Sequence, residues 1–203
     1  MKINKFLNFF KSISLIISLG TILGGAPLLY ANSSAPAEPQ HKVKQSFLSC
    51  AIITSEHLTI LQLYQRGLPK EVTINSLPSI SRQARKRVDY VYDVAEKMGI
   101  LNTYTDINTN FARCSTLVYQ VKGKPAPDLK EHAYYFCSGE NKVRFEVILK
   151  LDKHMSIDTI ANALPPRYMH VITTYQKLIM SKGLLSAFDL TANNLKSCLQ
   201  QIE

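Results

Sequence analysis

The sequence predicts an all-α protein with two tandem, disulfide-stapled four-helix modules that follow a signal peptide. Apolar residues recur at steps of three and four, four cysteines stand at matching places in two halves, and the first residues are basic and then apolar. The predicted parts are a signal peptide (1–31), a flexible tether (32–45), module 1 (46–121), a linker (122–128) and module 2 (129–203).

The first 31 residues have the order of a secretory signal peptide. Three lysines form a basic head, an apolar stretch spans 12–29, and the small residue Ala31 offers a cleavage site, with a second at 35–37. The alternative is an inner-membrane anchor, because roughly 20 apolar residues can span a bilayer. We predict export to the periplasm with cleavage near Ala31.

The two halves of the mature chain form an internal repeat. A shift of 87 positions (137 − 50) superimposes Cys50 on Cys137 and Asn-Ser-Leu-Pro at 75–78 on Asn-Ala-Leu-Pro at 162–165. A shift of 84 positions (198 − 114) superimposes Cys114 on Cys198. Four cysteines permit three pairings, and the repeat selects Cys50 with Cys114 and Cys137 with Cys198, so that each copy is closed on itself.

The first copy begins with two predicted helices. The first helix spans about 46–66 and ends at Gly67. Its apolar face consists of Cys50, Ile53, His57, Leu61, Tyr64 and Leu68. A short helix follows from Pro69, which suits a first helical turn because its missing N–H is not needed there, and it stops before Pro78.

Two longer helices complete the first copy. The third spans 80–98 and is capped by Gly99, and the fourth starts near Asp106. The apolar face of the third consists of Val88, Val91, Tyr92, Ala95 and Met98. The inward stripe of the fourth consists of Ile107, Phe111, Cys114, Leu117 and Val121. Because Cys114 points inward, a bridge back to Cys50 on the first helix is expected.

The second copy repeats this plan. Its first helix carries Cys137, Ile148, Leu151 and Met155, and Ser156 is the expected N-cap of the short helix. The expected core residues of its last two helices are Ile172, Tyr175, Ile179, Phe188, Leu195, Cys198 and Ile202. The aromatic residues at 134–136 are a candidate contact patch, although two of the three are expected in the core.

The first copy has a recognisable frame. Cys50 is followed by Arg66 and Gly67, then by a helix rich in Tyr and Val, and then by Phe111 to Cys114. This frame resembles small exported proteobacterial helical proteins of unknown function, which carry one such cysteine pair per module. More loosely, the chain is similar to periplasmic immunity proteins that neutralise type VI secretion amidase effectors, and to acid-stress chaperones. In the second copy, a Lys-His pair replaces the Arg-Gly pair.

The sequence contains no catalytic or metal-binding motif that we can assign. The predicted bridges use all four cysteines, and the histidines lack H-E-x-x-H spacing. No nucleophile elbow, P-loop or Rossmann glycine pattern occurs. We therefore expect no catalytic residue, metal or cofactor. An enzymatic role would require a pocket that joins His57 or His170 to a carboxylate, whereas His57 is expected to be a partly buried residue of the apolar face.

A basic cluster is the one concentrated polar feature. It consists of Arg82, Arg85, Lys86 and Arg87 near the start of the third helix. The first three share a face, and their position is electrostatically unfavourable because helix N-termini attract anions. The cluster is therefore a candidate contact for an acidic partner. The alternative is a solvated surface, which Asp89, Asp93 and Glu96 partly neutralise. Asp89 and Asp93 are expected to form surface ion pairs.

These observations favour a binding protein. Cleavage after Ala31 removes 3 lysines and no acid, so the formal net charge falls from +9 to +6 and still favours anionic partners. We predict a periplasmic protein that recognises an envelope or secreted protein with an acidic surface, such as a toxin or hydrolase that it inhibits. An envelope stress chaperone or an enzyme of unrecognised type are the alternatives. Nucleic-acid binding lacks a motif, and membrane contact is expected only through an uncleaved signal segment. The sequence does not predict the oligomeric state.

Overall fold

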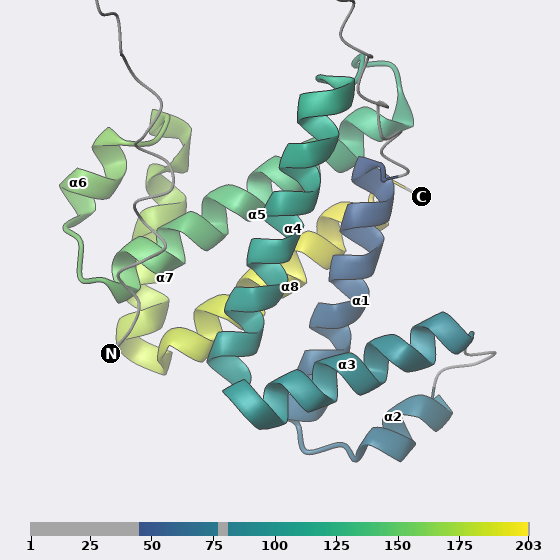
Figure 1. Ribbon diagram of the computed structural model, residues 1–203. Coiled ribbons are helices and arrows are strands. Elements are labelled where there is room, and N and C mark those ends of the chain that lie inside the picture. The colour runs from purple at the N-terminus through teal and green to yellow at the C-terminus, as the bar shows by residue number, and fades with distance from the viewer. Residues whose placement is uncertain (1–44, 77–80, 203) are drawn as a thin grey trace, which may run out of the picture. The chain divides into compact units, whose positions relative to one another are not determined.

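Helices form every regular element of the described chain. The computed structural model describes residues 45–76 and 81–202, and the all-α prediction is confirmed for these residues (Figure 1). The elements are α1 (Phe47–Gln65), α2 (Lys70–Ser76), α3 (Arg82–Met98), α4 (Ile100–Lys122), α5 (Lys130–Asp152), α6 (Ile157–Asn162), the 3-10 helix η2 (Pro166–Tyr168), α7 (Met169–Lys182) and α8 (Leu184–Gln200). The predicted signal peptide (1–31) and almost all of the predicted tether lie outside the described residues.

Helix α1 begins with a capping box. The Ser46 side chain accepts a hydrogen bond from the backbone N–H of Ser49, and the Ser49 hydroxyl accepts one from the N–H of Ser46. The Glu131 carboxylate of α5 accepts from the N–H of Phe47 and places a negative charge at this helix N-terminus. At the other end, Gly67 has φ +77°, a left-handed conformation that glycine adopts without strain. The sequence predicted both ends.

A single glycine separates the last two long helices of each half. Gly99 (φ +79°) lies between α3 and α4, and Gly183 (φ +83°) lies between α7 and α8. Gly99 caps α3 as predicted, but the predicted start of the next helix near Asp106 is wrong. Helix α4 begins at Ile100, because one left-handed residue is enough to redirect the chain and the new helix starts at once.

The two disulfides have the predicted pairing. Cys50 of α1 is bonded to Cys114 of α4, and Cys137 of α5 is bonded to Cys198 of α8. The Cα–Cα distance is 5.9 Å in both bridges, which is within the usual range for disulfides. Each bridge therefore joins the first and last long helices of one half, and no cysteine remains free.

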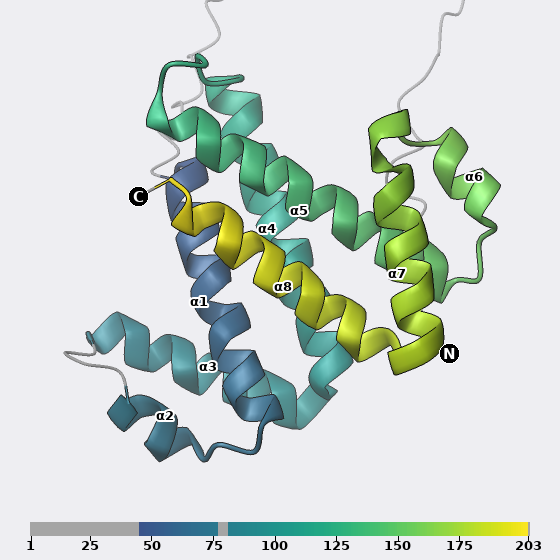
Figure 2. The ribbon, with the colours of Figure 1, turned by 180° about the vertical axis from the view of Figure 1, so that it is seen from behind.

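The helices of both halves share one core. All described helices fall within one unit of the chain, and α1 and α4 each contact both α5 and α8. Seen from behind in Figure 2, α8 crosses in front of α4. The Tyr104 ring of α4 stacks on the Phe188 ring of α8, with 5.4 Å between the ring centroids. The buried side chains of the two halves consequently form one continuous hydrophobic cluster.

Some predicted core positions are on the surface. The expected apolar residues that the structure exposes are Ile53, Met98, Leu117, Val121 and Met155. On α4, Leu117 and Val121 lie on a face that no helix covers fully, and the neighbouring Val118 is fully buried instead. Met155 lies beyond the end of α5 at Asp152. Helical spacing identifies rows of side chains, but the row that is buried depends on which helices pack against it.

His154 is strained at a position where the first half has a glycine. Among the described residues it is the one non-glycine residue with positive φ, at +56°, and the shift of 87 (154 − 67) relates it to Gly67. This conformation costs roughly 1–2 kcal/mol for an L-residue with a side chain. We expect His154→Gly to raise the free energy of unfolding by about 0.5–1 kcal/mol, since glycine's greater unfolded-state entropy offsets part of the gain.

Urea unfolding of the oxidised protein measures this change. Gly67→Ala is the matched variant, and we expect it to lower the free energy of unfolding by about 1 kcal/mol because it introduces the same strain. A decrease in stability for His154→Gly would show that the imidazole contributes more than the strain costs.

Candidate functional site

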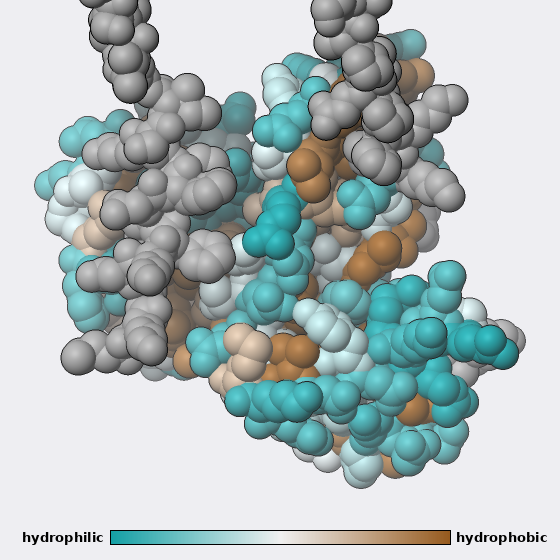
Figure 3. Space-filling view, viewed as in Figure 1, coloured by the Kyte–Doolittle hydropathy of each residue, from teal (hydrophilic) through white to brown (hydrophobic). Residues whose placement is uncertain are grey.

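The predicted cationic cluster lies on the first two turns of α3. Ser81 caps this helix, because its side chain accepts a hydrogen bond from the Ala84 N–H at 3.1 Å. Arg82, Arg85 and Lys86 are all exposed. Within residues 45–76 and 81–202, none of these three forms an ion pair. Figure 3 shows hydrophilic residues gathered over α2 and α3.

Arg87 does not belong to this exposed surface. Its Nε lies 2.8 Å from the Glu56 carboxylate of α1, and both side chains are only about a quarter exposed, at 27% and 26%. The pair therefore holds α3 against α1. Arg82, Arg85 and Lys86 alone form the exposed cationic face.

Two of the three acidic residues of α3, Asp89 and Asp93, pair with a lysine of α2. Lys70 of α2 lies 3.4 Å from the Asp89 carboxylate and 3.2 Å from the Asp93 carboxylate. The predicted surface ion pairs are confirmed at these two residues, and they connect α2 to α3 rather than balance the cationic face. Three cations consequently stand at a helix N-terminus whose own dipole is positive, and a bound carboxylate would relieve their repulsion.

A second polar site surrounds His57 beside the first disulfide. A depression of about 250 Å³ is lined by Cys50, Cys114, His57 and Tyr90, among others. The ring centroids of His57 and Tyr90 are 5.5 Å apart, and the Tyr90 hydroxyl donates to the Asp106 carboxylate at 2.9 Å. The buried Nε2 of His57 has no hydrogen-bond partner among the described residues. Asp106 therefore contacts Tyr90, and no carboxylate is hydrogen-bonded to His57 there.

Protonation of His57 should destabilise the fold. Burial is the main cause that lowers the pKa of His57 below its usual 6.5; Arg87 lowers it further, while Glu56 and Asp106 raise it. Below about pH 6.5 the unfolded chain takes up this proton, but the folded protein does not until the pH reaches the lowered pKa. We expect the free energy of unfolding to decrease between pH 7 and pH 5, and to decrease less in His57→Gln.

Urea unfolding at several pH values tests this prediction. His170→Gln is the control, because it removes an exposed imidazole rather than a buried one. Identical slopes for wild type and His57→Gln would contradict the prediction.

An aromatic groove lies between α4, α5 and η2. Its volume is about 390 Å³, and Phe47 at the start of α1 also lines it. The rings of Tyr119 and Tyr135 are stacked, with 6.1 Å between their centroids. Of the aromatic residues predicted as a patch at 134–136, the first two pack against the core as expected, while Phe136 is 53% exposed and faces the groove. Tyr119 and Tyr168 complete the aromatic lining. No spacing in the sequence predicts that these two residues lie at the same site.

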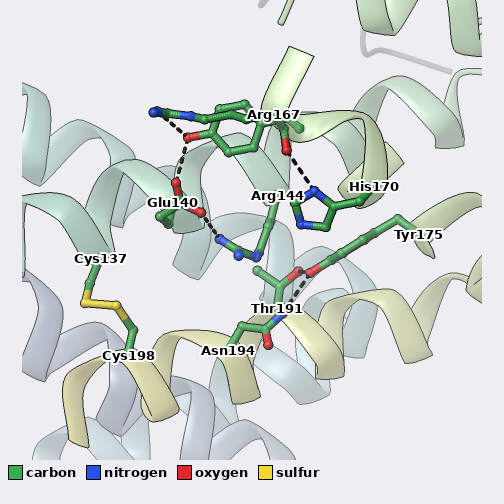
Figure 4. Close-up of polar contacts among 10 residues, drawn as sticks. Cys137, Glu140, Arg144, Arg167, His170, Tyr175, Thr191, Asn194 and Cys198 are labelled. Atoms are coloured by element: carbon green, nitrogen blue, oxygen red, sulfur yellow. Dashed lines mark hydrogen bonds and ion pairs between the residues drawn. A yellow bond between two sulfur atoms is a disulfide. The ribbon is translucent and has the colours of Figure 1, made fainter. Parts of the chain in front are cut away.

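A hydrogen-bonded chain of charged groups borders this groove. Glu140 of α5 pairs with Arg144 at 2.8 Å and accepts a hydrogen bond from the Tyr168 hydroxyl at 2.6 Å. Figure 4 shows Glu140 between Arg144 and the Arg167 side chain. Arg167 donates to the same hydroxyl at 3.0 Å, and its guanidinium lies 4.8 Å from the centre of the Tyr168 ring. Burial and then the Glu140 carboxylate raise the pKa of Tyr168 above its usual 10. The chain contains two guanidinium groups and one carboxylate, so it is net positive.

The described helices carry neither a metal-binding cluster nor a membrane span. In 45–76 and 81–202, no group of three or more His, Cys, Asp or Glu side chains is placed to hold a metal ion. The helices within these ranges are too short or too polar to cross a membrane. No protein-family model, no curated protein and no solved structure matches this chain.

Proposed function

We propose that this protein is an exported binding protein whose cationic face contacts an acidic surface of another envelope or secreted protein. The observation that carries the proposal is the exposure of Arg82, Arg85 and Lys86 without a carboxylate partner among the described residues. Asp89 and Asp93 are paired with Lys70, and Glu56 is paired with Arg87, so these three carboxylates do not neutralise the cationic face.

The scaffold supports recognition of a protein. Two disulfides and one shared core hold the cationic face on a packed helix, and a preorganised surface loses little entropy on binding. Disulfides persist in oxidising compartments, which is consistent with a partner outside the cytosol. Clustered charges accelerate association and select for complementary partners. An inhibitor or immunity protein for a secreted toxin or hydrolase is the role that fits these properties best.

We also propose that the chain is a tandem duplication of one four-helix unit. Several pairs of features support it: Gly99 and Gly183, the left-handed residues Gly67 and His154, and the two bridges. The shift of 84 relates Tyr104 to Phe188, which stack on each other, and the contacts of α1 with α8 correspond to those of α5 with α4. Under this shift Arg85 and Lys86 fall on Met169 and His170, so the first copy alone carries the cationic face.

Affinity capture with charge-reversed variants tests the proposed function. The oxidised mature protein is immobilised and exposed to an oxidised periplasmic extract, and retained proteins are identified by mass spectrometry. We expect a retained protein with an acidic surface to be lost when Arg82, Arg85 and Lys86 are changed to Glu. The matched control changes Lys124, Lys153 and Lys177 to Glu, which are exposed, lie outside α3 and carry the same total charge.

The control should retain the partner, and added salt should release it from the wild type. Far-UV circular dichroism checks that both variants are folded. Retention of the same proteins by the wild type and by the cationic-face variant would show that this face is not the contact surface.

A stress chaperone is the second candidate, and exposed apolar residues favour it. Ile52 and Ile53 of α1, and Leu117 and Val121 of α4, are each more than two-fifths exposed, at 51%, 43%, 46% and 58%. Figure 3 shows apolar surface over these two helices. A chaperone would expose more apolar surface under acid stress, so the fluorescence of a hydrophobic dye should increase as the pH falls. A constant fluorescence would remove this candidate.

A further inference from the structure

The aromatic groove is a separate site from the cationic face. Residues of α1, α4, α5 and η2 line it, and no residue of α3 does. Its volume of about 390 Å³ is in the range of pockets that bind small molecules or single side chains with their backbone. Large aromatic side chains at its edge are about half exposed, with Tyr119 at 49% and Phe136 at 53%. Exposed aromatic rings of this kind are enriched at binding sites.

Gly139 keeps the groove open at a cost in helix stability. It lies in the middle of α5 and lines the groove. A Cβ atom added there would meet nothing within 4 Å, so packing within the protein does not require a glycine. Glycine in a helix interior is less stable than alanine by roughly 0.5–1 kcal/mol. Across the groove, α4 presents the small residues Ala112, Ser115 and Thr116. The small side chains of α4 and of α5 therefore leave the space between them open.

The polar border of the groove is suited to an anion. Glu140 already interacts with Arg144 and with the Tyr168 hydroxyl, so its charge is satisfied. Arg167 has no carboxylate within ion-pair distance among the described residues. The Ser115 hydroxyl, which lines the groove, is buried without a hydrogen-bond partner in the described chain. An apolar groove with one uncompensated guanidinium matches an apolar ligand that carries a carboxylate.

We propose that the aromatic groove binds the C-terminal residue of a partner polypeptide. An aromatic or large aliphatic side chain would pack against Tyr135 and Phe136, and the terminal carboxylate would accept hydrogen bonds from Arg167. A polypeptide C-terminus combines both groups within one residue. Because Tyr119 and Phe136 are half exposed, the groove is open to solvent and the rest of the bound chain can leave it.

Two small probes test the carboxylate. N-acetyl-L-phenylalanine mimics a C-terminal residue, and N-acetyl-L-phenylalanine amide has the same side chain without the charge. With the oxidised mature protein, we expect the acid to bind about tenfold more tightly than the amide in NMR titrations, because a charge-assisted hydrogen bond contributes to one complex only. Arg167→Gln should abolish this difference and leave the amide's affinity unchanged, whereas Lys177→Gln, an exposed cation of α7, should change neither.

A further variant tests the groove itself. Gly139→Leu should weaken both probes at least severalfold, and it should leave the protein folded because leucine favours helices and a Cβ atom at this position meets nothing within 4 Å. A longer probe, N-acetyl-Ala-Ala-Phe, should bind at least as tightly as N-acetyl-phenylalanine. Equal affinity for acid and amide, unchanged binding by Gly139→Leu, the absence of saturable binding at millimolar concentrations, or loss of binding on lengthening the probe would each overturn the proposal.

Discussion

Removal of one disulfide is expected to lower the free energy of unfolding by about 4 kcal/mol. The Cys50–Cys114 bridge closes a sequence separation of 64 residues, and the Cys137–Cys198 bridge closes 61. A cross-link of this span removes many conformations from the unfolded chain, and the two values are so similar that the two losses should be nearly equal. Alanine is the suitable replacement, because Cys50 and Cys137 are buried and a serine hydroxyl there would lack a partner.

Thermal unfolding followed by circular dichroism measures this effect. For a chain of this size, a loss of about 4 kcal/mol corresponds to a decrease of roughly 8–16 °C in Tm. The variant that lacks both bridges would lose about 8 kcal/mol, which is comparable to the whole stability of an ordinary domain, so it should be largely unfolded. Wild-type melting temperatures in both single-bridge variants would contradict this expectation.

The shape of these transitions tests the shared core as well. Because α1 and α4 contact α5 and α8, loss of either bridge should shift one transition of the whole unit. Two separate transitions would show instead that each half unfolds independently. The dependence on disulfides also connects the fold to its environment, since the bridges form and persist under oxidising conditions.

The sequence predicted the features that are local or that repeat. Gly67 and Gly99 ended helices because a left-handed residue is a local requirement, and the structure confirms both. The confirmed cysteine pairing was predicted from a proposed internal repeat, because two copies with one cysteine at each end would have one arrangement that closes each copy. These predictions needed only the order of residues along one helix or the comparison of two segments.

The features that depend on packing between the halves were not predictable. Helical spacing shows which face is apolar but not which helix covers it, so the exposure of Leu117 and Val121 was missed. The aromatic groove joins Tyr119, Tyr135 and Tyr168, which come from three separate elements and form no motif. Arg87 was predicted to belong to the basic cluster because it follows Lys86 in the sequence. It pairs with Glu56 instead, and this contact exists only after α3 packs on α1.

Polar side chains in the shared core were missed for the same reason. Gln62 of α1 and Tyr104 of α4 are buried, and both donate hydrogen bonds to the Asp189 carboxylate of α8, at 3.2 and 2.6 Å. The side-chain amide of Gln65 donates to the other oxygen of the Asp189 carboxylate at 2.9 Å. The Asp189 carboxylate therefore accepts hydrogen bonds from three side chains of the first half. These contacts join α1 and α4 to α8, and no disulfide connects either helix to α8.

Asp189→Ala should lower the free energy of unfolding by roughly 3 kcal/mol, because it removes the charged acceptor of three donors. The buried Tyr104 hydroxyl and Gln62 amide keep only their longer contacts to Gln65 and Asn193. Tyr104→Phe should cost about 1.5 kcal/mol, since it removes one donor and leaves the other two in place. The variant that carries both changes should lose about 1 kcal/mol less than the sum of the two single losses, because the two residues interact with each other. Urea unfolding of the four proteins gives this coupling energy, and additive losses would show that the pair does not interact.

The same network predicts sensitivity to alkali. Burial and then the Asp189 carboxylate raise the pKa of Tyr104 far above its usual 10, so the folded protein keeps a proton that the unfolded chain releases. Above pH 10 the free energy of unfolding should consequently decrease by about 1.4 kcal/mol per pH unit for this one group. Tyr104→Phe removes the titrating hydroxyl, so its stability should decrease less steeply above pH 10. If the stability of Tyr104→Phe decreased as steeply above pH 10 as that of the wild type, Tyr104 would ionise as readily in the folded protein as in the unfolded chain. The hydrogen bond to Asp189 would then not retain the proton of the Tyr104 hydroxyl.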